Sequence, residues 1–295
     1  MGFNKKGLSL ALSSMSFLIV SGAGVSAIDS YQEQVRLKQE KVELENKKTA
    51  IEQAKRDALI AKYTGVNPDY IEHAYDSTLI SNKLLNKDYT NNEKIVFLTF
   101  DDSLSSNTNK ILDVLDANEV KATFFVLGKR IETGGDTASA LLKDIYQSGH
   151  AIGNHTYSQS SNILYPRSKV NVDNFAEELN KTEKLMQDAL EMPDFKTRVY
   201  RAPGGTTVWR GTQALKDYSL ANNIIPIDWN ISNKDSEGKK KTAEELVKQS
   251  TENAKDKDIV VLLMHDNDSR TNTVESLDEI IKWYKDNGYT FKTLG

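Results

Sequence analysis

From residue 94 to the C-terminus, short apolar segments typical of buried strands alternate strictly with segments of helical periodicity. The first apolar segment is a continuous run, which indicates a strand covered on both faces. Strands are predicted over 94–100, 122–127, 150–155, 198–201, 224–231 and 258–264, and helices over 108–118, 138–148, 173–191, 212–222, 242–254 and 273–287. This alternation predicts an α/β fold with a parallel sheet, either open or closed into a barrel.

Residues 1–27 have the pattern of a secretory signal peptide. Lys5 and Lys6 precede an uncharged, mostly apolar stretch over 8–20, and small residues follow at 25–27. An uncleaved membrane anchor is the alternative, but the apolar stretch is short and contains Ser, which favours cleavage. Both interpretations predict a secreted or cell-surface protein, with a membrane partner only if the segment is uncleaved.

Residues 28–90 are expected to form a charged helical stalk and a linker. The part over 29–62 lacks Gly and Pro, and Val35, Val42 and Ile51 recur at roughly helical spacing, which indicates a solvated helix. The apolar seam is thin, so coiled-coil self-association is only weakly supported. The Asn67-Pro68 step ends this helix, and the α/β domain is expected over 91–295.

The composition narrows the chemistry that this chain can perform. It has no cysteine and only four histidines, which excludes a disulfide scaffold, a thiol nucleophile, a thiolate zinc site and an iron–sulfur cluster. Any metal must therefore be held by carboxylates, imidazoles or amides. The net charge of −4 gives no reason to expect a nucleic-acid partner.

Polar residues cluster at the carboxyl ends of the predicted strands, where the active sites of parallel α/β proteins lie. Taken singly, each could be a turn residue, a surface ion pair or a core aromatic. Five consecutive strand ends of this kind predict a functional site. The residues at these ends are Asp101, Asp102, His155, Arg201, Trp229, Asp235, His265 and Asp266.

These residues lie in short motifs that resemble those of the polysaccharide deacetylase, or NodB-homology, family (carbohydrate esterase family 4). The motifs occur in the family's order: Thr99-Phe100-Asp101-Asp102, His155-Thr156, Arg201-Ala202-Pro203-Gly204-Gly205, Asp228 through Asp235, and Leu263-Met264-His265-Asp266. The resemblance runs from about residue 94 to the C-terminus. It implies an irregular (β/α) barrel with seven or eight strands.

The resemblance also implies a divalent metal, usually zinc, as cofactor. Asp102 and His155 would be metal ligands. Asp101 would be the general base that deprotonates a water, and Arg201 would orient it. A polysaccharide carrying N-acetyl groups would be the partner.

The remaining motif residues would complete the reaction. His265 would protonate the leaving amine, and Asp235 would keep its imidazole charged, with Asp228 as a weaker alternative. A backbone N–H near Gly204 would bind the oxyanion. The residues expected to contact the substrate are Gly204, Trp229 and Leu263.

The sequence departs from the family pattern most clearly at Gln159, which stands where the second motif has a second histidine. Gln159 would be the third metal ligand, but an amide oxygen is a poorer zinc ligand than an imidazole. Weaker zinc binding, a harder metal and a site without metal remain alternatives. Ser103 stands where the family usually has Gly, and Gly204 stands where many members have Tyr.

Two function classes therefore stay open. The first is an extracellular, metal-dependent deacetylase, with peptidoglycan N-acetylglucosamine as the expected substrate. Retention of Asp101, Arg201 and His265 favours it, because a pure binding protein has no need of a base, its clamp and an acid. The second is a glycan-binding descendant of weak or no activity, which Gln159 favours. A surface protein acting through helix 29–62 is a weaker third class.

Overall fold

The computed structural model describes the backbone from Gly22 onward and the side chains from Asp29 onward. The predicted signal segment over 1–27 lies outside the described side chains. The chain divides into two compact units, of which the first ends at Asp57 and the second runs over Ala58–Gly295. No helix in the described part of the chain has both the length and the apolar character needed to cross a bilayer.

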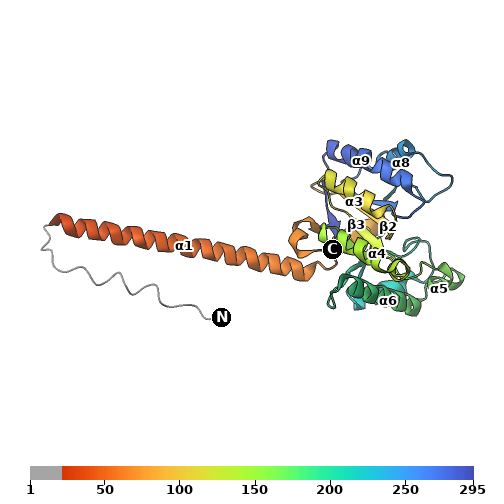
Figure 1. Ribbon diagram of the computed structural model, residues 1–295, viewed down its shortest axis with the longest axis horizontal. Coiled ribbons are helices and arrows are strands. Elements are labelled where there is room, and N and C mark those ends of the chain that lie inside the picture. The colour runs from red at the N-terminus through yellow and green to blue at the C-terminus, as the bar shows by residue number, and fades with distance from the viewer. Residues whose placement is uncertain (1–21) are drawn as a thin grey trace. The chain divides into compact units, whose positions relative to one another are not determined.

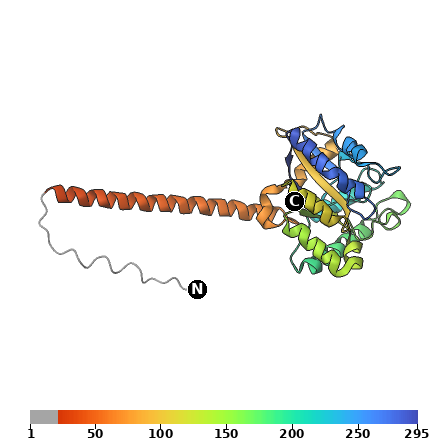
Figure 2. The same ribbon diagram turned by 45° about the horizontal axis from the view of Figure 1, so that its top comes forward.

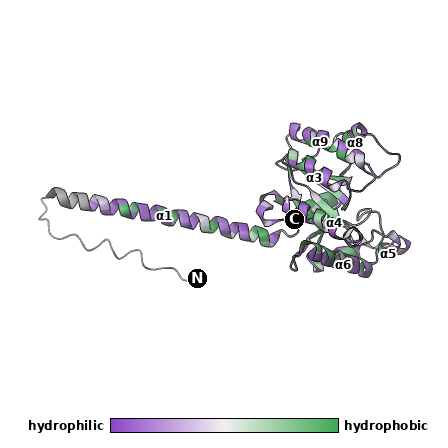
Figure 3. Cartoon of the chain, in the orientation of Figure 1, coloured by the Kyte–Doolittle hydropathy of each residue, from purple (hydrophilic) through white to green (hydrophobic). Residues whose placement is uncertain are grey.

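Helix α1 (Gly22–Lys62) confirms the solvated helix expected over 29–62. Its side chains from 29 to 55 are exposed, and Figure 3 shows them mostly in the hydrophilic colour. Ion pairs one turn apart join Arg36 to Glu33 and Glu40, at 2.6 and 3.2 Å. Pairs of opposite charge at this spacing favour the helical conformation, so local interactions support α1 without burial.

The second unit is built on a curled parallel sheet in the order β6-β5-β4-β3-β2-β8-β7, with β9 also paired to β2 (Figure 1). The sheet is open between β6 and β7, so it forms a half-barrel and confirms the predicted fold class. Its strands are β2 (Ile95–Ser103), β3 (Thr123–Val126), β4 (Ala151–Asn154), β5 (Val199–Tyr200), β6 (Ile225–Pro226), β7 (Ile231–Ser232), β8 (Ile259–His265) and β9 (Thr290–Phe291). A separate pair joins β1 (Ala74–Tyr75) to β10 (Thr293–Leu294).

Helices surround the sheet, as the two views in Figures 1 and 2 show. They are α2 (Ser77–Asn86), α3 (Thr108–Ala117), α4 (Gly128–Gln147), α5 (Ser161–Leu164), α6 (Val172–Leu190), α7 (Thr212–Ala221), α8 (Ala243–Thr251) and α9 (Thr271–Asp286), with 3-10 turns η1 (Pro68–His73) and η2 (Pro166–Ser168). Local sequence fixes the start of α8, where Thr242 and Glu245 form a capping box.

The continuous apolar run of β2 is explained by burial on both faces. Val96, Leu98 and Phe100 belong to a core cluster shared with α3, α4 and α9. The alternate residues Ile95 and Phe97 belong to a second cluster, which also holds Phe125 and Val261 from the neighbouring strands. Because successive side chains point to opposite faces, the inner positions continue through Thr99 to Asp101 at the strand's carboxyl end.

Residues 58–90, expected to be stalk and linker, belong to the same compact unit as the sheet. Ile80 of α2 is fully buried in the second core cluster, which also holds Ile95 and Phe97 of β2. Ile71 of η1 is buried beside Val66 and Ala151 in another cluster. This stretch is therefore packed against the half-barrel.

The predicted single strand over 224–231 is wrong. The segment forms two short strands at opposite edges of the sheet, because β6 pairs with β5 and β7 pairs with β8. The β5–β6 ladder ends at the bond from the Ile227 N–H to the Tyr200 carbonyl, and the Asn230 N–H already donates to the Val261 carbonyl of β8. The chain therefore crosses from one edge to the other between residues 226 and 231.

Candidate active site

Asp101 at the end of β2 is held by a buried ion pair. Its Oδ1 accepts a hydrogen bond from Arg201 at 2.8 Å, and both side chains are almost completely buried. The same guanidinium donates to Thr99 Oγ1 at 2.7 Å and to the Ile227 carbonyl at 2.9 Å, and it lies 4.2 Å from the centre of the Phe125 ring. A buried guanidinium needs such a counter-charge and full hydrogen bonding, so the pair fixes the carboxylate.

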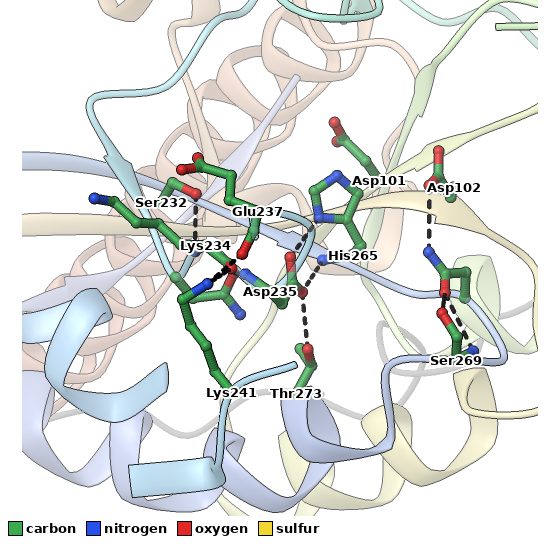
Figure 4. Close-up of polar contacts among 12 residues, drawn as sticks. Asp101, Asp102, Ser232, Lys234, Asp235, Glu237, Lys241, His265, Ser269 and Thr273 are labelled. Atoms are coloured by element: carbon green, nitrogen blue, oxygen red, sulfur yellow. Dashed lines mark hydrogen bonds and ion pairs between the residues drawn. The ribbon is translucent and has the colours of Figure 1, made fainter. Parts of the chain in front are cut away.

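His265 at the end of β8 is paired in register with Asp101. Its Nδ1 lies 2.6 Å from Asp235 Oδ1, and its backbone N–H donates to Asp235 Oδ2 at 2.9 Å. Thr273 donates to the same Oδ2 at 2.8 Å. Figure 4 shows the His265 ring between the carboxylates of Asp235 and Asp101. Asp228 instead accepts from Thr206, so Asp235 is the carboxylate that contacts this imidazole.

The electrostatic environment favours the charged form of both partners. Burial lowers the pKa of His265, but its hydrogen bond to Asp235 and the charges of Asp235, Asp101 and Asp102 outweigh it and raise that pKa. Burial raises the pKa of Asp235, but the hydrogen bond and charge of His265 outweigh it and lower that pKa. The pair is therefore set up as imidazolium and carboxylate.

The residues proposed as metal ligands also come together. His155 Nε2 lies 3.7 Å from Asp102 Oδ1, and Gln159 Nε2 lies 2.8 Å from that same oxygen. His155 Nδ1 lies 2.9 Å from the Arg201 carbonyl oxygen. A carbonyl can only accept, so Nδ1 carries a proton, and a neutral His155 ring has its lone pair on Nε2.

Asp102 and His155 fit a divalent cation. Two tetrahedral zinc ligands at about 2.0–2.1 Å lie about 3.3 Å apart, close to the separation seen here, and the His155 tautomer is the one that a metal requires. Gln159 does not complete the set as it stands, because its amide nitrogen faces the other two. No group of three or more His, Cys, Asp or Glu side chains among the described residues has metal-site geometry.

Two residues that sequence reasoning missed hold these side chains in place. Glu178 of α6 is buried and accepts hydrogen bonds from Tyr157 N at 3.2 Å, from Ser158 N at 3.0 Å and from the Ser158 hydroxyl. It thereby fixes the loop that carries Gln159. Asn267 donates to Asp102 Oδ2 at 3.4 Å. Neither residue lies in a motif, and Glu178 looks like a solvent-facing position of an amphipathic helix.

Asp266 has a structural position behind the site. It is fully buried, and its two oxygens accept from the Ser105 and Thr108 hydroxyls at 2.5 and 2.6 Å. Its backbone N–H donates to the Asp101 carbonyl at 2.8 Å. Burial raises the pKa of Asp266 although these hydroxyls act in the opposite direction. Asp266 therefore ties the loop after β2 to the end of β8.

The three residues expected to contact substrate are not equivalent in their placement. Gly204 and Trp229 line a cavity of about 620 Å³ between α2 and α7. Gly204 is exposed, while Leu263 is buried on β8 outside that cavity. Gly205 has a φ of 80°, and a Cβ there would lie 3.3 Å from the Trp229 ring, so only glycine suits this close approach.

Comparisons with known proteins agree with this geometry. Residues 88–222 match the sequence profile of the polysaccharide deacetylases. The fold is similar to a Streptococcus mutans CE4 esterase, with a TM-score of 0.72 and 35% identity over 79% of this chain and 96% of that one.

Two curated relatives share the same region. A peptidoglycan-N-acetylglucosamine deacetylase of Bacillus cereus is 30% identical over 69% of this chain and 88% of its own length. A bifunctional xylanase/deacetylase of Pseudobutyrivibrio xylanivorans is 28% identical over 70% of this chain, which spans only 30% of that protein. With the half-barrel and its strand-end residues, these matches show that the chain belongs to the polysaccharide deacetylase family (carbohydrate esterase family 4), whose members are hydrolases that act on amide bonds.

Proposed function

We propose that this chain is an extracytoplasmic deacetylase that removes N-acetyl groups from peptidoglycan N-acetylglucosamine. One observation carries the proposal: Asp101 and His265 stand in register on neighbouring strands, and each is hydrogen-bonded to a buried partner of opposite charge. The activity named for the Bacillus cereus relative supports the substrate. The signal-like segment over 1–27 supports the location.

Asp101 is the proposed general base. Arg201 holds its Oδ1, which leaves Oδ2 to accept a proton from the attacking water. As the water oxygen bonds to the acetamide carbon, the carbonyl oxygen becomes an oxyanion. The Gly204 backbone N–H is the proposed donor to that oxyanion.

His265 is the proposed general acid. It donates its Nε2 proton to the amide nitrogen as the carbon–nitrogen bond breaks, giving acetate and a free amino group on the sugar. Asp235 accepts from Nδ1 at 2.6 Å and so fixes the ring and stabilises its charged form. Before the next cycle Asp101 releases the proton that it took to solvent, and His265 takes up a proton from solvent.

Asp102 and His155 would hold a divalent metal, for which we propose zinc. When bound, it supplies Lewis-acid polarisation of the acetamide carbonyl and of the attacking water. Asn267 orients Asp102, and the Arg201 carbonyl fixes the His155 tautomer.

Acetate release by the full chain tests the proposal. The substrates are purified peptidoglycan, N-acetylglucosamine oligomers and acetylated xylan, each with added zinc, manganese or cobalt. Release from peptidoglycan that Asp101→Asn removes supports the proposal. No release from any substrate with any metal contradicts it, and release from xylan alone would move the chain to a different substrate class.

One observation favours the second candidate, a glycan-binding descendant without activity. The amide nitrogen of Gln159, rather than an imidazole, faces Asp102 and His155. Sedimentation with peptidoglycan in the absence of any acetate release would support this candidate.

A further inference from the structure

The side-chain amide of Gln159 bridges the two side chains proposed to bind metal. Its Nε2 lies 2.8 Å from Asp102 Oδ1 and 3.4 Å from His155 Nε2. The amide nitrogen carries two hydrogens and no usable lone pair. It therefore acts as a donor toward both groups and cannot act as a ligand in this arrangement.

Each acceptor that a metal needs already has a hydrogen-bond donor. His155 Nδ1 donates to the Arg201 carbonyl, so in the neutral ring the lone pair on Nε2 faces Gln159. Asp102 accepts a hydrogen bond from the Gln159 amide on Oδ1 and one from the Asn267 amide on Oδ2. The pair is thus satisfied by amide hydrogens, which carry partial positive charge.

The orientation of the amide follows from its neighbours. If Oε1 and Nε2 exchanged places, the amide oxygen would face a carboxylate oxygen and an imidazole lone pair, which is repulsive. A cation at the same place would be repelled by the amide hydrogens. The amide must therefore leave this position when a metal binds.

The backbone beneath Gln159 is fixed, whereas its side chain has room to move. Thr156 and Gln159 adopt left-handed φ values of 66° and 57°, and buried Glu178 anchors the residues between them. Gln159 itself is exposed, and His155 is buried. The loop therefore places the Gln159 amide beside Asp102 and His155, and the side chain can rotate out into solvent.

We propose that Gln159 is an internal competitor of the divalent metal rather than its third ligand. Its amide keeps Asp102 and His155 hydrogen-bonded when no metal is bound, and a metal binds only by displacing it. The inference rests on the proposed metal site but not on catalysis, because it concerns metal affinity alone.

Zinc titration of the full chain by calorimetry separates a competitor from a ligand. Removal of a ligand weakens binding, whereas removal of a competitor strengthens it. We expect Gln159→Ala to bind zinc about 2- to 12-fold more tightly than the wild type, the equivalent of one net hydrogen bond. Equal or weaker affinity overturns the proposal.

Two variants complete the titration. Gln213→Ala is the matched control. The Gln213 amide also donates to a carboxylate, that of Asp217 at 2.8 Å, but it lies outside this site. The zinc affinity of this variant should equal that of the wild type. Asp102→Asn should lose zinc binding. If it keeps full affinity, the metal binds elsewhere and the proposal fails.

Nuclear magnetic resonance of the ¹⁵N-labelled wild type gives a second test, which uses no variant and so does not depend on whether a variant folds. The Gln159 NH₂ signals, assigned through their contact with His155, should lose that contact and shift toward free-amide positions as zinc is added. Signals that keep the His155 contact at saturating zinc overturn the proposal. Neither measurement depends on deacetylation, so a failure of the proposed function is seen separately.

Discussion

Asp101 and His265 stand at the same level of two neighbouring parallel strands, where the β2–β8 register pairs them directly. Neighbouring strands lie about 4.8 Å apart, so a carboxylate and an imidazole reach toward one small volume from two sides. Each has its own buried partner, Arg201 for Asp101 and Asp235 for His265. A base and an acid placed in this way can act on opposite sides of a single amide group.

Replacement of Asp101 by Asn should remove the base while leaving its shape. We expect kcat for acetate release to fall by about 10²–10⁴-fold, the usual contribution of a general base, with a much smaller change in KM. Asp116→Asn, on the exposed face of α3, is the matched control and should behave as wild type. Steady-state kinetics on peptidoglycan checks both. If Asp101→Asn keeps more than about a tenth of the activity, Asp101 is not the base.

Replacement of Asp235 by Asn should change the pH dependence. His265 must be protonated to donate, so kcat/KM falls as pH rises through its pKa. Asp235 contributes to raising that pKa, together with Asp101 and Asp102, against the effect of burial. Asp235→Asn should therefore move the alkaline limb of the kcat/KM profile to lower pH. Asp228→Asn should leave that limb in place, because Asp228 contacts Thr206. A limb that moves equally in both variants contradicts the assignment.

Strands that are buried on both faces can be predicted from the sequence, whereas the partners with which strands pair cannot. The strand predicted over 94–100 corresponds to β2, because a strand covered on both faces produces an apolar run that local sequence reveals. The segment over 224–231 is also rich in apolar residues, but the structure divides it between two edges of the sheet. Pairing partners are set by contacts far away in sequence, and a local pattern does not contain them.

The same limit applies to the site. Asp101, Arg201 and His265 were identified because carboxylate, guanidinium and imidazole groups at strand ends carry chemistry. Glu178 and Asn267 act only by hydrogen-bonding residues 20 and 165 positions away. Neither residue is part of a motif, so their contacts with the site are seen only in the folded structure.

The Asp235–His265 pair should also shape stability against pH. The folded pKa of His265 is raised above 6.5, so its stabilisation is complete below pH 6.5 and is lost as pH rises through the folded pKa. The folded pKa of Asp235 is lowered below 3.8, so its stabilisation is complete above pH 3.8 and is lost as pH falls through the folded pKa.

The pair is therefore fully stabilising between pH 3.8 and 6.5. Urea unfolding at pH values inside, below and above this window, for the wild type and His265→Gln, measures the effect. The difference in free energy of unfolding between the two should be largest inside the window and should shrink on both sides. A difference that is constant with pH would show that the loss comes from packing alone.

Replacement of Asp266 should destabilise the fold through two orphaned hydroxyls. In Asp266→Ala, the buried Ser105 and Thr108 hydroxyls lose their acceptors. Leaving buried polar groups unsatisfied costs about 1–3 kcal/mol each, so for two hydroxyls we expect a loss of about 2–6 kcal/mol in the free energy of unfolding. Asp113→Ala, which removes an exposed carboxylate of α3, is the control and should change the free energy of unfolding by about 0.5 kcal/mol or less.

The Asn variant separates hydrogen bonding from charge at the same position. Because burial raises the pKa of Asp266 above 3.8, the wild type loses stability at this position as pH rises from 3.8 through the folded pKa. Asp266→Asn keeps an acceptor and carries no charge, so it should cost less than Asp266→Ala and should lack this pH dependence. Chemical unfolding at several pH values checks both expectations. If the Ala and Asn variants are equally unstable at every pH, the hydroxyl contacts do not carry the energy.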